Sequence, residues 1–261
     1  MGERTSYAPG TFCWLDLSST DVEGSKAFYS GLFGWDCEDT PTGPDSSYTM
    51  ARLGGQDVAA LRSQSDTERS QGIPPHWFCY ISVDGLDARA AKAAELGANL
   101  VAPPFDVMEA GRMAVVQDPT GAMVGLWEAK KQPGAELVNA PGALSWNDLQ
   151  TRDLDSARSF YSELLGWTTE DTPGPMPYFV IWNGEHTNGG MTAIADEWGD
   201  VPPNWMPYFG AVGTCEETAG RTEELGGGVR MPATDVPAGR FAVLHDPQGA
   251  TFAVFEGDMD P

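Results

Sequence analysis

The sequence has few cationic side chains. It contains 15 Lys and Arg against 38 Asp and Glu in 261 residues, a formal net charge of −23. A field of that sign repels the phosphates of nucleic acids and the headgroups of anionic membranes. We therefore expect neither a nucleic acid nor a membrane as partner. The acidity either serves solubility alone or attracts cationic ligands.

Cysteine and histidine are also scarce. There are three histidines, and four cysteines stand singly with no CxxC pair: Cys13, Cys37, Cys79 and Cys215. This spacing argues against a disulfide framework and a zinc knuckle, and predicts reduced, mostly buried thiols.

Long apolar runs and common catalytic motifs are missing. No stretch has membrane-spanning length, and the first ten residues lack a basic-then-apolar pattern, so we expect a cytoplasmic protein. The sequence contains no GxSxG elbow, no GxxxxGK[ST] phosphate loop and no Rossmann fingerprint. The glycine-rich ELGGGVR at 224–230 follows an expected helix and is typical of a helix-ending turn.

What the sequence does contain is a long internal repeat. CWLDLSSTDVEGSKAFYSGLFGW at 13–35 returns as SWNDLQTRDLDSARSFYSELLGW at 145–167. Two shorter phrases repeat in the same order: PPHWFCY (74–80) with PPNWMPY (202–208), and AGRMAVVQDPTGA (110–122) with AGRFAVLHDPQGA (238–250). We predict two domains, at 10–128 and 142–257, joined by a linker at 129–141 whose Lys, Pro and Gly content indicates exposure.

In each copy the sequence predicts a strand, a helix and three strands, and this order occurs twice. In the first copy, residues 11–18 alternate as a strand does, and residues 20–34 form a helix. A capping box of Thr20 and Glu23 should begin this helix, and Gly34 should end it. A hairpin is predicted around Gly54 and Gly55.

This tandem layout and the repeated phrases resemble the vicinal oxygen chelate superfamily, which includes glyoxalase I, extradiol dioxygenases, fosfomycin-modifying enzymes and bleomycin-binding proteins. The resemblance implies an α+β fold of two tandem glyoxalase-like domains. Each would consist of two βαβββ motifs that form a curled mixed sheet around a cleft. The chain would then be a monomer built like a fused dimer, and further dimerisation stays open.

The resemblance also implies where metal ligands would stand. The corresponding positions are Trp14, Phe78 and Gly125 in the first copy and Trp146, Met206 and Ala253 in the second. None of these side chains supplies imidazole, carboxylate or thiolate, so we predict no metal and no cofactor. A displaced cluster of His76, Asp16 and Glu128 is the alternative, but two residues along a strand are a shift of about 6.6 Å.

Residues two apart on a strand share a face, so the neighbours of the ligand positions on that face would form the cleft wall. Their side chains are a mixture of aromatic, small and acidic ones. The predicted wall residues, beyond those six positions, are Asp16, Met123, Trp127, Asp148 and Phe255. Gly125 would leave space for an organic ligand, and tryptophans would stack on its rings. In the alternative, Trp14 and Trp146 fill that space as core. Asp16 and Asp148 are either general bases or hydrogen-bonding residues that fix the backbone.

In each copy an acidic loop precedes the fifth strand. The loop ends in a Pro-Pro-x-Trp phrase that would hold an aromatic ring at the cleft mouth. Trp35 and Trp167 follow helix-ending glycines and are predicted core residues.

The preferred function is metal-independent binding of a planar, cationic aromatic natural product, as an antibiotic resistance or biosynthetic accessory protein. The alternatives are an enzyme of hydroxylase, isomerase or lyase type, which acts on a polyketide-like substrate through cleft carboxylates or an organic cofactor, and an interaction protein with inactive clefts.

Overall fold

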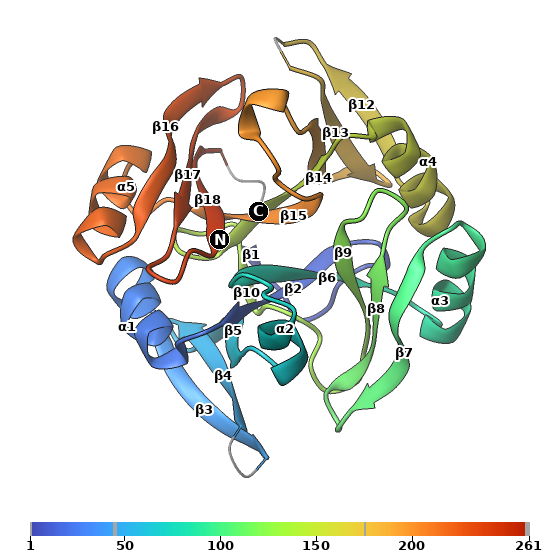
Figure 1. The fold of residues 1–261 in the computed structure, drawn as a ribbon, viewed down its shortest axis with the longest axis horizontal. Coiled ribbons are helices and arrows are strands. Elements are labelled where there is room, and N and C mark those ends of the chain that lie inside the picture. Colours follow the sequence, from blue (N-terminus) through green and yellow to red (C-terminus); the bar gives the residue numbers. More distant parts are fainter. Residues whose placement is uncertain (1, 44–45, 175, 259–261) are drawn as a thin grey trace.

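The computed structural model describes residues 2–43, 46–174 and 176–258 and contains two eight-stranded mixed sheets (Figure 1). The first sheet has the order β3-β4-β5-β2-β6-β9-β8-β7. Its elements are β2 (Phe12–Ser19), α1 (Val22–Phe33), β3 (Asp36–Gly43), β4 (Ser46–Leu53), β5 (Gln56–Ser63), β6 (His76–Ser82), α3 (Leu86–Glu95), β7 (Asn99–Val107), β8 (Gly111–Gln117) and β9 (Met123–Ala129).

The second sheet repeats this order as β12-β13-β14-β11-β15-β18-β17-β16. Its elements are β11 (Leu144–Thr151), α4 (Leu154–Leu165), β12 (Thr168–Thr172), β13 (Tyr178–Asn183), β14 (His186–Ala193), β15 (Asn204–Gly210), α5 (Cys215–Glu224), β16 (Gly228–Val236), β17 (Gly239–His245) and β18 (Thr251–Gly257). The predicted α+β fold of two tandem domains, each with two βαβββ motifs, is confirmed.

Four short elements lie outside these motifs. Strands β1 (Gly2–Glu3) and β10 (Leu137–Val138) pair antiparallel. The helix α2 (Asp66–Ser70) and the 3-10 helix η1 (Asp196–Trp198) occupy the loops before β6 and β15. No helix of the described residues is long and apolar enough to cross a membrane.

The first helix of each copy begins at an aspartate. Asp21 precedes α1 and accepts a hydrogen bond from the Gly24 amide at 3.0 Å. The predicted capping box at Thr20 is therefore wrong, because the neighbouring carboxylate caps the helix. The helix ends as predicted at Gly34, whose φ of 74° lies in the left-handed region that glycine adopts without strain.

The two copies share their cores. Residues of α1 (Phe28, Tyr29, Leu32 and Phe33) are buried in one cluster with Phe209, Phe252 and Val254 of the second copy. Likewise α4 packs in a cluster with Val124 and Leu126 of β9. Figure 1 shows the result: α1 lies beside α5, and α4 lies beside α3. Each first helix therefore packs on the other copy, as pseudo-two-fold symmetry requires.

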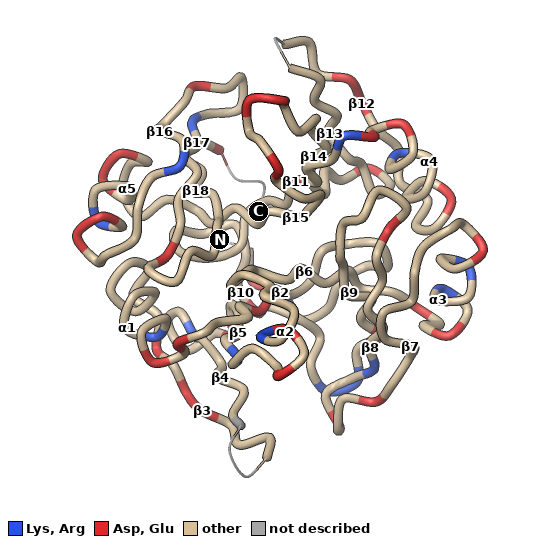
Figure 2. The backbone as a smooth tube through the Cα atoms, in the orientation of Figure 1, with Lys and Arg blue, Asp and Glu red and all other residues tan. Residues whose placement is uncertain are grey.

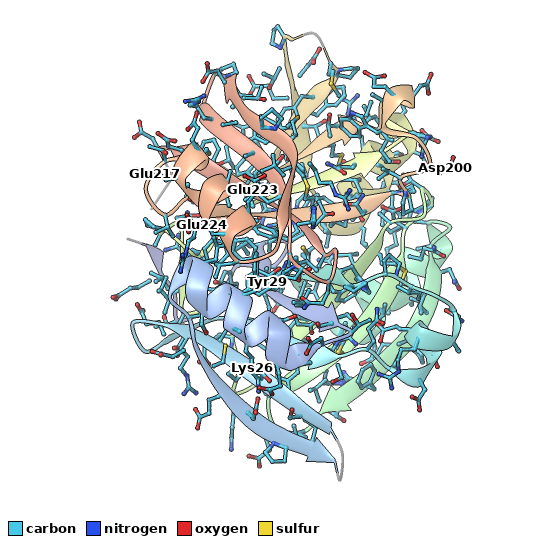
Figure 3. The ribbon with its side chains drawn as sticks, turned by 60° about the vertical axis from the view of Figure 1, so that its left-hand side comes forward. Lys26, Tyr29, Asp200, Glu217, Glu223 and Glu224 are labelled. Carbon is cyan, nitrogen blue, oxygen red and sulfur yellow. The ribbon has the colours of Figure 1, made fainter. Side chains whose placement is uncertain are left out.

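The repeated phrases FY and DPxGA meet across this interface. Tyr29 donates a hydrogen bond to Asp246 at 3.2 Å, and Tyr161 donates to Asp118 at 2.9 Å. Figure 3 shows Tyr29 on the side of α1 that faces the second copy, with Lys26 on the opposite side. The other oxygen of Asp118 accepts from the amides of Thr120 and Ala122, which shapes the turn. The aspartate of each DPxGA phrase thus fixes a turn and the interface together.

The segment predicted as an exposed linker is exposed only in part. Residues 129–131 are exposed, but Ala135, Leu137 and Val138 are buried. The Ala135 amide donates to the Cys13 carbonyl at 2.8 Å, which ties the segment to β2. The prediction of exposure was wrong here because apolar residues of the linker cover the first sheet.

Candidate functional site

In the second copy, three neutral donors surround one buried carboxylate. Asp148 is 3% exposed. Its Oδ1 accepts hydrogen bonds from the Trp146 indole and the Tyr178 hydroxyl, both at 2.9 Å, and its Oδ2 accepts from the Tyr208 hydroxyl at 2.7 Å. We call these four residues the Asp148 cluster.

Strand register brings the cluster together. Trp146 and Asp148 are two residues apart on β11 and so share a face. Tyr208 pairs with Trp146 on the antiparallel neighbour β15, and Ala253 pairs with Tyr208 on β18. Tyr178 comes from β13, two strands away on the other side.

Gly190 is what lets Tyr178 reach the carboxylate. This glycine pairs with Asp148 on the intervening strand β14. A Cβ at Gly190 would collide with the Tyr178 hydroxyl oxygen and with Asp148 Oδ1. A side chain at this position would therefore push the two groups apart.

The first copy contains the equivalent four residues, but its tryptophan donates to the tyrosine instead of the carboxylate, and a fifth residue is added. Asp16 accepts from the Tyr80 hydroxyl at 2.7 Å, and Trp14 donates to Tyr48 at 2.8 Å. Tyr48 lies 3.5 Å from Asp16, farther than the equivalent 2.9 Å in the second copy. The residue in register with Asp16 on β5 is Ala60, whose methyl group stands where Gly190 has none.

The addition is a cation. Arg62 Nε lies 3.4 Å from Asp16 Oδ1, and its two terminal nitrogens each donate at 3.0 Å to Glu68 of α2. Burial opposes the charged form of Arg62, but the two carboxylates raise its pKa. The acidic loop before β6 thus places Glu68 of α2 on the Arg62 that pairs with Asp16.

The space expected at Gly125 is filled. A Cβ there would collide with the ring of Tyr80 and come within 3.0 Å of Phe78. Trp127 lies 6.5 Å from Tyr80, centroid to centroid, and is buried, as is Trp14. Predicted residues Trp14, Phe78 and Trp127 therefore do line one region, but the idea that Gly125 leaves open space is wrong, because a tyrosine on the adjacent strand occupies it. Met123, on the same strand, is partly buried.

Two aromatic side chains of the second copy are less buried than their counterparts in the first. Met206, Tyr208 and Ala253 form a small cluster of their own, and the partly buried side chains packed on it are Trp146, Phe241, Val243 and Phe255. The structure thus brings together the predicted residues Trp146, Met206, Ala253 and Phe255. Trp146 and Phe255 keep exposed surface that their counterparts Trp14 and Trp127 lack.

The residues at the expected metal positions do not fit a metal. Tryptophan, phenylalanine, glycine, methionine and alanine stand there. Among the described residues no three His, Cys, Asp or Glu side chains are grouped closely enough to hold an ion. The displaced set is also separated: His76 contacts the Pro74 carbonyl, and Glu128 accepts from the amides of Gly85 and Leu86.

The tryptophans of the Pro-Pro-x-Trp phrases are core residues. Trp77 and Trp205 are buried and donate to the interface tyrosines Tyr29 and Tyr161 at 3.1 and 2.9 Å. The prediction that they stand at the cleft mouths is wrong. Side chains alternate along a strand, so Trp77 and Trp205 point to the face opposite that of Phe78 and Met206. The core positions of Trp35 and Trp167 are confirmed.

Sequence reasoning missed the four cleft tyrosines. A signal was present: Tyr80 and Tyr208 end the repeated phrases PPHWFCY and PPNWMPY, and Tyr48 and Tyr178 stand near the start of equivalent strands. A polar aromatic retained in both copies needs a hydrogen-bond partner when buried, and the carboxylate in register supplies it.

Residues 11–126 match the family model of the Glyoxalase/Bleomycin resistance protein/Dioxygenase superfamily, and residues 147–255 match that of the Glyoxalase-like domain. A mycobacterial protein is 41% identical over 98% of both chains. The chain belongs to the glyoxalase/bleomycin resistance/dioxygenase superfamily. The family predicted from the repeated phrases is confirmed.

That mycobacterial relative is CFP32 of Mycobacterium tuberculosis, which carries a provisional glyoxylase name. The anthracycline biosynthesis protein DnrV of Streptomyces peucetius is 37% identical over 97% of this chain and 95% of its own.

Solved superfamily structures share the fold at low identity. The 2,3-dioxygenase LapB of Pseudomonas sp. KL28 has a TM-score of 0.68 at 15% identity and covers 98% of this chain and 95% of its own. The Mn(II)-bound glyoxalase of Novosphingobium aromaticivorans has a TM-score of 0.66 at 16% identity, with 97% and 85% covered.

Burial raises the pKa of the Asp148 carboxyl, although the three hydrogen bonds that it accepts oppose the shift. Because this pKa is higher in the folded than in the unfolded state, the folded state binds more protons between the two values. The contribution of Asp148 to stability is thus largest at low pH and is lost as pH rises through the folded pKa.

We expect the Tm of Asp148→Asn minus the Tm of wild type to increase as pH rises from about 4 to 7. Calorimetry on both proteins tests this, and a Tm difference independent of pH would contradict it.

Proposed function

We propose that this protein binds a planar aromatic small molecule of secondary metabolism without a metal ion. The observation that carries the proposal is the second cleft, where a partly exposed tryptophan and phenylalanine flank a buried, hydrogen-bonded carboxylate. Aromatic rings supply flat surfaces for stacking, and each such contact contributes about 0.5 to 1.5 kcal/mol beyond burial.

Two further facts support this function. The relatives named for anthracycline biosynthesis cover 95% of their own length in the match, so the likeness extends over the whole protein. Asp and Glu residues are also spread over the outer helices and loops (Figure 2). With a net charge of −23, the field attracts cationic compounds.

The test is a binding titration with a panel of anthracyclines, anthraquinones and acridines, followed by tryptophan quenching and confirmed by calorimetry. We expect at least one compound to bind at micromolar concentration, in the presence or absence of EDTA. Trp146→Ala should weaken its binding at least about fivefold, since truncation of a central aromatic contact costs about 1 kcal/mol or more.

Phe105→Ala is the matched control, because Phe105 is 44% exposed on the edge strand β7 and lies outside both clusters. Its affinity should equal that of wild type. If no compound of the panel binds more tightly than millimolar, or if Trp146→Ala binds like wild type, the proposed function is wrong.

A second candidate function is proton transfer on an aromatic substrate. Asp148 carries a raised pKa and contacts two tyrosine hydroxyls, an arrangement in which a carboxylate accepts a proton and a phenol stabilises the resulting oxyanion. Deuterium exchange into an enolisable polyketide-type ligand, lost in Asp148→Asn, would favour this function; binding without exchange would favour the first.

A further inference from the structure

The two clefts differ in how the charge of their carboxylate is balanced. Asp16 has Arg62 at 3.4 Å as a partner of opposite charge. None of the ion pairs formed within residues 2–43, 46–174 and 176–258 includes Asp148. The position equivalent to Arg62 is Thr192, since Arg62 pairs with Ser18 on β2 and Thr192 pairs with Gln150 on β11.

Neutral donors alone hold the Asp148 carboxylate. The two oxygens of a carboxylate offer about four acceptor sites, and Trp146, Tyr178 and Tyr208 occupy three of them. One acceptor site remains, and no cationic side chain of the described residues forms an ion pair with the group. A buried charge without a counterion is unfavourable, and a cation brought by a ligand relieves that cost.

Access also distinguishes the clefts. In the first, the rings of Phe78 and Tyr80 fill the space over Gly125, and α2 adds Glu68 beside Arg62. In the second, Trp146 and Phe255 are partly exposed. A cation that reaches Asp148 would therefore also lie close to Trp146, whose indole N–H donates to the same carboxylate.

We propose that the second cleft binds the protonated amine of a planar aromatic ligand, with Asp148 as its counterion and Trp146 against the ligand. In the first cleft Arg62 already stands beside the equivalent carboxylate, so this cleft takes no further cation. This assignment rests on the proposed function and adds the chemical class of ligand and the cleft that selects it.

Gly190 is the specificity-determining residue in this scheme. Its missing side chain lets Tyr178 approach to 2.9 Å, so three neutral donors, instead of an arginine, contact the carboxyl group. The first copy has Ala60 here, a tyrosine at 3.5 Å and an arginine. The second copy therefore combines Gly190 with Thr192, and the first copy combines Ala60 with Arg62 at the equivalent positions.

The test compares daunorubicin, an anthracycline with a protonated amino sugar, with N-acetyldaunorubicin, in which acetylation removes the charge and keeps the rings. We expect wild type to bind daunorubicin at least about tenfold more tightly at low salt, with one cation-selective site per chain. In Asp148→Asn the preference should fall to about twofold or less while affinity for the acetylated compound is kept. Asp16→Asn should keep the wild-type preference.

Thr192→Arg provides a second variant if Asp148→Asn does not fold. It places an arginine where the first copy has one, and it should abolish the preference for daunorubicin. Near-UV circular dichroism and Tm establish folding of each variant. Equal affinity of wild type for both compounds, or loss of the preference in Asp16→Asn instead of Asp148→Asn, would overturn the assignment and leave the proposed function standing. If neither compound binds wild type below millimolar concentration, both fail for this ligand class.

Discussion

Expressed separately, residues 1–128 and 142–261 should each fail to form a stable, soluble monomer. Each core contains residues of both copies: Phe28, Leu32 and Phe33 of α1 are almost fully buried in a cluster that includes Phe209 and Phe252. Burial of one such side chain contributes about 1.5 to 3 kcal/mol. Loss of three or four of these contacts therefore removes a stabilisation comparable with the whole free energy of unfolding of a domain, about 5 to 15 kcal/mol.

Size-exclusion chromatography and circular dichroism measure the outcome. Each half alone should aggregate or self-associate through its exposed apolar face, and the mixed halves should recover a species of the mass of the full chain. The control is the full chain with a protease site in the exposed segment 129–131, which should stay assembled after cleavage. Two well-behaved monomers with cooperative unfolding would show that the shared core is dispensable.

Asp118→Ala and Asp246→Ala should each lower the free energy of unfolding by about 3 kcal/mol or more. Asp118 accepts three hydrogen bonds within its turn and one from Tyr161 across the interface. Its removal leaves buried amides and a buried hydroxyl without acceptors, at about 1 to 3 kcal/mol for each group that water does not reach. Asp246 is fully buried, and this burial raises the pKa of its carboxyl.

Urea unfolding at pH 7 gives the free energies. Tyr161→Phe should cost less than Asp118→Ala, since it removes two hydrogen bonds, the one to Asp118 and the one from Trp205, instead of four. The double variant should be less than additive because the two residues share a contact. Asp84→Ala, at an exposed position, should stay within about 0.5 kcal/mol of wild type. A cost below about 1 kcal/mol for either aspartate would mean that DPxGA only forms a turn.

Much of the fold was determined by the sequence itself. Alternation in residues 11–18, the helix end at Gly34 and the in-register repeat predicted the strand, helix and three-strand motifs, because these patterns depend on neighbours within a few residues. The absence of imidazole, carboxylate and thiolate at the six transferred positions was likewise evident from residue identity alone. The shared face of Trp146 and Asp148 also followed from the two-residue period of a strand.

Only the tertiary structure decided what those residues contact. The ring of Tyr80 fills the space over Gly125, and Arg62 reaches Asp16, because non-adjacent parts of the chain become neighbours through strand register. The burial of Leu137 in the linker and the pairing of Tyr29 with Asp246 depend on how one copy packs on the other. The difference between the clefts has the same origin: Gly190 and Ala60 look equally small in the sequence, but only a folded sheet places one methyl group between a tyrosine and a carboxylate.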